Sequence, residues 1–344
     1  MIPPLPQNGQ RAPLWQHELR QAFGRPQDLL AYLELDPALP ALAAGMLRDF
    51  PLRVPRGFAA RMRKGDPRDP LFLQVWPSTQ EAVVTPGYVV DAVGDLPRVR
   101  EAGLLHKYQG RVLLVATGAC AVHCRYCFRR HFPYSEQLAA RDHWAAALAE
   151  IAADSSIEEV ILSGGDPLSL SDDKLAELVA RLDAIPHLQR LRIHTRQPIM
   201  LPERIDERLL AWLDRTRLQT VFVLHANHAA ELDDSVRRAL LPLRERGIAL
   251  LNQSVLLRGI NDDATTLASL SKRLFECGVL PYYLHLLDRV QGAAHFDLPE
   301  DDAQRLMRVL SSQLPGYLLP KLVREIAGAP AKTWIAWEAS APSR

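Results

Sequence analysis

Two hydrophobic rhythms divide the chain near residue 100. Before that point, apolar residues recur at three- and four-residue spacing over residues 14–23, 26–35 and 40–50, and prolines repeatedly interrupt the pattern. This spacing is typical of short amphipathic helices that are joined by irregular connections. We therefore expect a small helical N-terminal domain over residues 1–105.

Beyond that boundary, short apolar runs with strand character alternate with helical patterns. The runs cover residues 111–117, 158–165, 188–195, 219–226, 248–257, 280–287 and 317–326, and the helical patterns include residues 172–185, 233–247 and 262–278. Strands that alternate with helices predict a parallel sheet of the α/β class. About six or seven such units, with no GxGxxG motif after the first strand, favour a partial (β/α)6 barrel of the TIM type over a doubly wound sheet. We assign this barrel to residues 106–334 and treat residues 335–344 as a C-terminal tail.

Composition removes several classes of function. The 344 residues are 48% hydrophobic and 24% charged, as in ordinary globular proteins, and the net charge of +1 argues against a dedicated nucleic-acid binder. The N-terminus lacks a signal-peptide pattern, and no apolar run reaches membrane-spanning length. Four cysteines in a chain of this size do not form a disulfide scaffold. These features predict a cytoplasmic protein without membrane or nucleic-acid partners.

Three of the four cysteines, Cys120, Cys124 and Cys127, follow the first predicted strand with the spacing C-x3-C-x2-C. In a parallel barrel, chemistry occurs on the loops that follow the strands. A structural zinc site needs four ligands, so zinc would require His123 or a distant residue as well. A [4Fe–4S] cluster bound by only three thiolates would keep one iron open for another ligand. The spacing favours the cluster and leaves zinc as an alternative.

This cysteine motif resembles that of the radical S-adenosylmethionine (SAM) superfamily. The resemblance implies that SAM binds the open iron and is cleaved to a 5′-deoxyadenosyl radical. A second motif, Gly164-Gly165-Asp166, follows the next predicted strand, where the superfamily typically has Gly-Gly-Glu in contact with the SAM amino group. By itself SGGDP would be an ordinary strand-to-helix turn, but its position one unit after the cysteines favours the SAM-binding role.

Further motifs narrow the resemblance to the lysine 2,3-aminomutase family. They lie between roughly Pro51 and Thr333 and include RYCFRRHFPY, RLRIHTRQPI, LLNQSVLLRGIND, PYYLHLLDRVQGAAHF and GAPAKT. The resemblance is greatest to the branch that makes (R)-β-lysine for the modification of elongation factor P. Other members carry a C-terminal extension with zinc-binding cysteines, and this chain has no cysteine after Cys277. Homo-oligomerisation is left open.

The same resemblance implies the remaining cofactor and the residue roles. Pyridoxal 5′-phosphate (PLP) would be bound by Lys332, since the other nearby lysine, Lys321, does not match the motif. The remaining matches are Arg111 near the PLP phosphate, His225 and Gln253 near the SAM adenosyl group, Arg129 at the substrate carboxylate, and Asp288 and Glu325 at the ε-ammonium of lysine. The reaction implied is a 1,2-amino migration that converts L-lysine to β-lysine.

Alternative functions remain at this point. A catabolic lysine 2,3-aminomutase or a glutamate 2,3-aminomutase would share every cofactor motif, although glutamate has no ammonium for Asp288 and Glu325 to bind. An iron–sulfur electron carrier would need a fourth thiolate and would not use the GAPAKT motif. The partners we expect are L-lysine, a reducing donor such as flavodoxin, elongation factor P and the ligase that attaches lysine to it.

Overall fold

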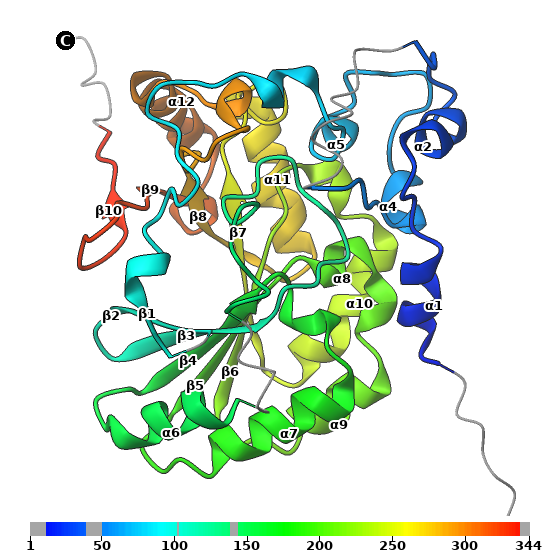
Figure 1. Cartoon of the computed structure of the whole chain (residues 1–344). Coiled ribbons are helices and arrows are strands. Elements are labelled where there is room, and N and C mark those ends of the chain that lie inside the picture. Colours follow the sequence, from blue (N-terminus) through cyan, green and yellow to red (C-terminus); the bar gives the residue numbers. More distant parts are fainter. Residues whose placement is uncertain (1–11, 39–49, 102, 138–143, 338–344) are drawn as a thin grey trace, which may run out of the picture.

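The computed structural model describes residues 12–38, 50–101, 103–137 and 144–337 of the chain. Its strands form one sheet of ten, in the order in which they occur in the sequence (Figure 1). They are β1 (Val99–Glu101), β2 (Leu104–Tyr108), β3 (Arg111–Thr117), β4 (Glu159–Gly164), β5 (Arg190–Thr195), β6 (Gln219–Leu224), β7 (Ala249–Val255), β8 (Leu280–His285), β9 (Lys321–Arg324) and β10 (Thr333–Trp334). Neighbours from β3 to β9 pair in parallel. β1, β2 and β10 pair antiparallel at the two edges.

Helices connect the parallel strands, as the alternating pattern predicts. The longer ones are α6 (Ala145–Ala153), α7 (Asp172–Asp183), α9 (Glu207–Leu213), α10 (Asp234–Glu245), α11 (Ala264–Glu276) and α12 (Glu300–Gln313), and the four-residue α8 (Gln197–Met200) follows β5. This α/β fold, with its mostly parallel sheet, confirms the predicted fold class. Within the described residues, no helix is both long and apolar enough to cross a membrane.

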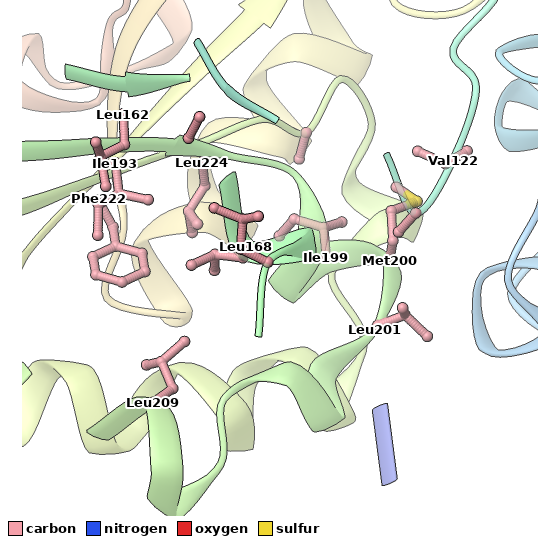
Figure 2. Close-up of a cluster of buried hydrophobic side chains, with 14 of the residues drawn as sticks. Val122, Leu162, Leu168, Ile193, Ile199, Met200, Leu201, Leu209, Phe222 and Leu224 are labelled. Carbon is pink, nitrogen blue, oxygen red and sulfur yellow. The ribbon is translucent and has the colours of Figure 1, made fainter. Parts of the chain in front are cut away.

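The hydrophobic core lies between the sheet and the helices that cover its outer face. Figure 2 shows part of this cluster, in which Ile193 of β5 and Phe222 of β6 extend toward Leu209 of α9. Every second residue of a strand points to the same face, so the alternate positions point into the curve of the sheet. Those inward positions carry many polar residues, among them Arg111, Ser163, Arg192, His194, Gln253, Tyr283 and His285. The barrel therefore has a polar interior.

The first hundred residues pack against the barrel. The structure has α1 (Leu14–Arg20), α2 (Pro26–Tyr32), α4 (Arg56–Ala59) and α5 (Pro70–Leu73), so the first two predicted helices are present, while the predicted helix over residues 40–50 falls almost entirely outside the described residues. Side chains of α2, α4 and α5 belong to the same buried cluster as the barrel strands. β1 and β2 straddle the predicted boundary at residue 105 and belong to the sheet. The proposed division into domains stays a prediction.

The two edges of the sheet approach each other through their side chains. On one edge, β2 contributes Lys107 and Tyr108, and on the other, Glu325 directly follows β9. The Tyr108 hydroxyl donates a hydrogen bond to the Glu325 carboxylate, and Lys107 Nζ lies 3.7 Å from Glu325 Oε1. The sheet is thus curled into a partial barrel whose edges meet at a group of charged residues.

Candidate active site

The loop that carries the three cysteines begins where β3 ends and is seated on the end of β4. The amide of Gly165 donates to the carbonyl of Thr117 at 2.7 Å, and the amide of Asp166 donates to the carbonyl of Ala119 at 2.7 Å. A Cβ atom on Gly164 would lie 2.3 Å from the Thr117 oxygen, and one on Gly165 would lie 2.4 Å from the Ala119 oxygen. Gly164 also has a φ of +123°, which other residues rarely adopt. The glycine pair therefore allows the cysteine loop to approach β4 closely.

Buried ion pairs hold the far side of this loop. Arg125, between the second and third cysteines, donates to Glu81 through Nε at 2.8 Å and through Nη2 at 2.5 Å. Arg130 donates to the same carboxylate at 2.5 Å, and all of these side chains are fully buried. Val122 is buried in the core, and Figure 2 shows it near Met200. A charge left unpaired in such surroundings is strongly destabilising, so this arrangement fixes the loop.

The sulfur atoms sit in partly exposed positions on this fixed loop, and all of them are free thiols. Burial, and then the charge of Asp166, raise the pKa of Cys120. Burial, and then Cys124, raise the pKa of Cys127 to about 11 against the opposing charges of Arg129 and Arg130. Thiols that resist ionisation on their own need cationic iron to become thiolates. Within the described residues, no three His, Cys, Asp or Glu side chains lie close enough to bind a single metal ion. Three thiols on one fixed loop are the donor set that a [4Fe–4S] cluster with one open iron would take, so the residues present fit a cluster.

A chain of alternating charges runs between the two edges of the sheet. Arg129 Nε donates to Asp95 Oδ2 at 2.7 Å, and Lys107 Nζ lies 2.6 Å from Asp95 Oδ1. Lys107 then faces Glu325, which accepts a hydrogen bond from Lys332 Nζ at 2.5 Å. Burial opposes ionisation of both acids, but the facing cations outweigh it and lower the pKa of Asp95 and of Glu325. Both acids are therefore carboxylates at neutral pH.

Asp288 lies beside this chain of charges, and among the described residues its carboxylate has no ion pair of its own. Its pKa is raised to about 7, mainly by burial; the charge of Lys332 opposes this rise and the charge of Glu325 adds to it. Burial lowers the pKa values of His194 and His285 well below the usual range, and the positive charge of Lys332 lowers them further. Around Lys332 the structure thus combines the neutral imidazoles of His194 and His285, the paired carboxylate of Glu325, and Asp288, whose pKa is about 7.

Sequence comparisons identify the family. Residues 114–269 match the radical SAM superfamily. The chain is 50% identical to the L-lysine 2,3-aminomutase of Escherichia coli (strain K12) over 320 residues, which cover 93% of each protein. It is also 50% identical to the enzyme of that name from Haemophilus influenzae, over 93% of this chain and 94% of the relative, and 30% identical to that of Clostridium subterminale, over 93% of this chain and 77% of the relative.

The chain belongs to the L-lysine 2,3-aminomutase family. It is therefore an isomerase of the radical SAM superfamily, and membership implies a [4Fe–4S] cluster and SAM. The electron-carrier alternative is set aside, because matches at this identity run along nearly the whole chain. A solved radical SAM methyltransferase from Sphaerobacter thermophilus is also similar, with a TM-score of 0.47 and 16% identity, over 64% of this chain and 68% of that one.

The structure brings most of the residues expected for an L-lysine 2,3-aminomutase into two neighbouring groups. Lys332, Glu325 and Asp288 lie together, and Arg111 joins them because its guanidinium stacks on the Tyr108 ring, 4.7 Å from the centroid. The other group surrounds the cysteines. His225 Nε2 lies 2.8 Å from the Tyr126 hydroxyl, and burial lowers the pKa of this histidine to about 3.

Gln253 and Asp166 differ in their surroundings: Gln253 lies next to Tyr283 in the sheet, whereas the Asp166 carboxylate is hydrogen-bonded to other parts of the chain. Gln253 pairs with Tyr283 of β8, and Lys332 Nζ lies 5.9 Å from the Tyr283 ring centroid. Asp166 uses its carboxylate within the chain, since it accepts hydrogen bonds from the Thr195 hydroxyl and from the amides of Leu168, Arg196 and Gln197. The carboxylate of Asp166 thus holds the turn after β5.

Sequence reasoning missed the residues that hold the predicted ones in place. Asp95 and Lys107 link Arg129 to Glu325, and Glu81 holds the cysteine loop. All of these lie in segments that precede the recognised motifs, in which charged residues look like ordinary surface positions. The YCFRRH stretch contains one clue in the sequence. Its two consecutive arginines follow the last cysteine of the motif, and arginines that are buried there need acidic partners.

Proposed function

We propose that this chain converts L-lysine to (R)-β-lysine with PLP as a second cofactor, and that the product is used to modify elongation factor P. In this proposal Cys120, Cys124 and Cys127 bind the [4Fe–4S] cluster and Lys332 binds PLP. When bound, cluster and SAM supply a carbon radical that removes hydrogen from the substrate, and PLP carries the migrating amino group.

The observation that carries the proposal is the charge arrangement around Lys332. An α-amino acid with a cationic side chain presents a carboxylate at one end and an ammonium at the other. This part of the barrel holds a buried guanidinium, that of Arg129. It also holds two acids, Asp288 and Glu325, and each of them interacts electrostatically with Lys332. Glutamate would bring a second carboxylate toward those acids, at a cost in like-charge repulsion.

Arg129 is prepared to bind a carboxylate. Asp95 holds its Nε, and its Nη1 donates to Ser163 Oγ at 3.0 Å, so the guanidinium plane is fixed from two sides. A guanidinium fixed in this way loses little conformational freedom when it binds a planar carboxylate. Arg129 would thereby set the position of the substrate relative to Lys332.

Lys332 and Glu325 would exchange partners when the substrate enters. In the structure Lys332 Nζ neutralises Glu325 at 2.5 Å. With PLP present, Lys332 would hold the cofactor aldehyde and would no longer be committed to Glu325, which would leave the Glu325 carboxylate for the ε-ammonium of lysine. Asp288 would ionise as the second cation approaches, because a nearby positive charge lowers a carboxyl pKa.

Substrate choice is tested by comparing amino acids under identical conditions. Anaerobically reconstituted protein with SAM, PLP and a strong reductant should consume L-lysine and form β-lysine, with L-glutamate and L-alanine poor or inert. A preference for glutamate would overturn the assignment of Asp288 and Glu325. The link to elongation factor P is tested separately, by the intact mass of that factor from cells with and without this gene. An unchanged mass would remove the proposed pathway and leave the chemistry standing.

A further inference from the structure

The guanidinium of Arg196 contacts the middle cysteine of the loop. Arg196 directly follows β5, and its side chain is 7% exposed. Nη1 lies 2.7 Å from Cys124 Sγ and 2.5 Å from the Tyr126 hydroxyl. The same hydroxyl lies 2.8 Å from His225 Nε2. The buried guanidinium of Arg196 therefore contacts Cys124, a proposed cluster ligand. It also contacts Tyr126, the neighbour of His225, which is expected near SAM.

The direction of this guanidinium is set by a buried polar network. Nη2 donates to Glu231 Oε2 at 2.8 Å and to Gln74 Oε1 at 2.6 Å. Both terminal nitrogens of Arg196, Nη1 and Nη2, therefore have hydrogen-bond partners. Glu231 is itself fixed, because it also accepts from the amides of Asn227 and His228 and from Gln74 Nε2. Asp166 accepts from the amide of Arg196 at 2.8 Å and holds its backbone. The hydrogen bond to Cys124 is thus built into the fold.

From this geometry we propose that Arg196 tunes the reduction potential of the cluster through a charged hydrogen bond to the Cys124 sulfur. The inference rests on the proposed function, in which Cys124 is a cluster ligand. Arginine stays protonated in proteins, so the donor persists in every redox state. When the cluster takes one electron from an external one-electron donor, negative charge on its sulfur ligands increases. A hydrogen bond to a ligand sulfur stabilises that reduced state and raises the potential.

The alternative role for Arg196 is purely structural, as the partner of Glu231. Arg204 offers a matched control, because it is also fully buried and paired with an acid, Asp172, at 2.9 Å. Its other hydrogen bonds go to the carbonyls of Leu168 and Leu170, it also lies near Asp206 and the Trp15 ring, and among the described residues it donates to no cysteine. Replacing either arginine by lysine removes the guanidinium bonds to a buried acid and keeps the charge, but only the change at Arg196 also removes the guanidinium donor to Cys124.

The experiment measures the midpoint potential of the cluster by redox titration followed by electron paramagnetic resonance. Full-length protein is reconstituted anaerobically as wild type, Arg196→Gln, Arg196→Lys and Arg204→Lys, and iron and sulfide are counted first. Arg196→Gln should lower the potential by at least 59 mV, a tenfold less favourable one-electron reduction. Arg196→Lys, which keeps the charge, should shift it less in the same direction. Arg204→Lys should match wild type.

The outcomes separate this inference from the proposed function. Equal potentials in wild type and Arg196→Gln, both with full iron content, would overturn the tuning role and leave the cluster assignment intact. Loss of the cluster from both Arg196 variants while Arg204→Lys loads fully would make Arg196 a structural residue and also overturn it. Failure of the wild type to bind iron would instead overturn the proposed ligand set on which the inference depends.

Discussion

Lys332 and Glu325 pair with each other where a substrate ammonium is expected to bind. An internal ion pair of this kind keeps two partly buried charges compensated. A substrate whose own ammonium takes over Glu325 restores the compensation, and one without it leaves an acid unpaired. At the scale of single residues, the proposed function therefore makes specificity for lysine depend on Glu325 exchanging Lys332 for the substrate ammonium.

Lys332 should be the residue that binds PLP. Its amine lies near the imidazoles of His194 and His285 and 5.9 Å from the Tyr283 ring centroid, among side chains that point into the curve of the sheet. Borohydride reduction of protein supplied with PLP, followed by peptide mapping, should place the pyridoxyl adduct on Lys332. Lys321 is the internal control, since it is exposed and lies 4.7 Å from the Trp334 ring centroid. An adduct on Lys321 instead would contradict the assignment.

Asp288 predicts how lysine binding depends on pH. Because its pKa is raised to about 7 without substrate, Asp288 is largely a carboxylate at pH 8 and largely protonated at pH 6. The KM for lysine should therefore rise as the pH falls through 7. Asp288→Asn should lose this dependence and lower lysine turnover on the order of 10²-fold, while it keeps SAM and PLP binding. Asp301→Asn on the exposed start of α12 is the control, and identical pH profiles for Asp288→Asn and wild type would refute the role.

Cys277 separates ligand cysteines from a core cysteine. It is fully buried at the end of α11 within the hydrophobic core, where a cysteine behaves as a small apolar residue. Cys277→Ala should keep wild-type iron content, whereas Cys124→Ala should abolish the cluster and SAM cleavage. Iron analysis after anaerobic reconstitution distinguishes the two. Full loading of Cys124→Ala would show that this thiol is not a ligand.

At the scale of elements, the turn after β4 positions the loop after β3. Gly165→Ala would place a Cβ 2.4 Å from the Ala119 oxygen and 2.7 Å from Gly118, so backbone must move. Such overpacking costs about 1–3 kcal/mol and should displace the cysteine loop. We expect a lower melting temperature and a clear loss of iron content. Gly316→Ala, where a Cβ meets nothing within 4 Å, should be neutral, and full iron loading in Gly165→Ala would argue against the positioning role.

The elements that could be predicted from the sequence are those with a strong local signal. The parallel strands from β3 to β9 are apolar runs between helical patterns, so all of them were expected. β1, β2 and β10 were not, because they are short and owe their pairing to residues already in the sheet. The cysteine motif is equally local. The bonds from Arg125 to Glu81 and from Arg196 to Cys124 join residues 44 and 72 positions apart, and only the fold brings these residues together.

At the scale of the whole molecule, the curl of the sheet unites two remote parts of the chain. Lys107 and Tyr108 come from one edge of the sheet, and Glu325 and Lys332 come from the other (Figure 1). The cysteine loop lies at the ends of the strands between them. The proposed reaction needs substrate, SAM and PLP to meet, and the curl of the sheet brings together, across its two edges, the residues proposed to bind PLP and the substrate ammonium.

The most direct test of the account is the fate of the amino nitrogen. L-lysine labelled with 15N at its α-amino group is incubated with the anaerobically reconstituted protein, SAM, PLP and a reductant, and the product is followed by NMR. Migration between adjacent carbons within one molecule predicts β-lysine with the label on C3 and none in unlabelled lysine added as a competitor. Label that stays on C2, is released as ammonia or spreads to other molecules would contradict the proposed reaction.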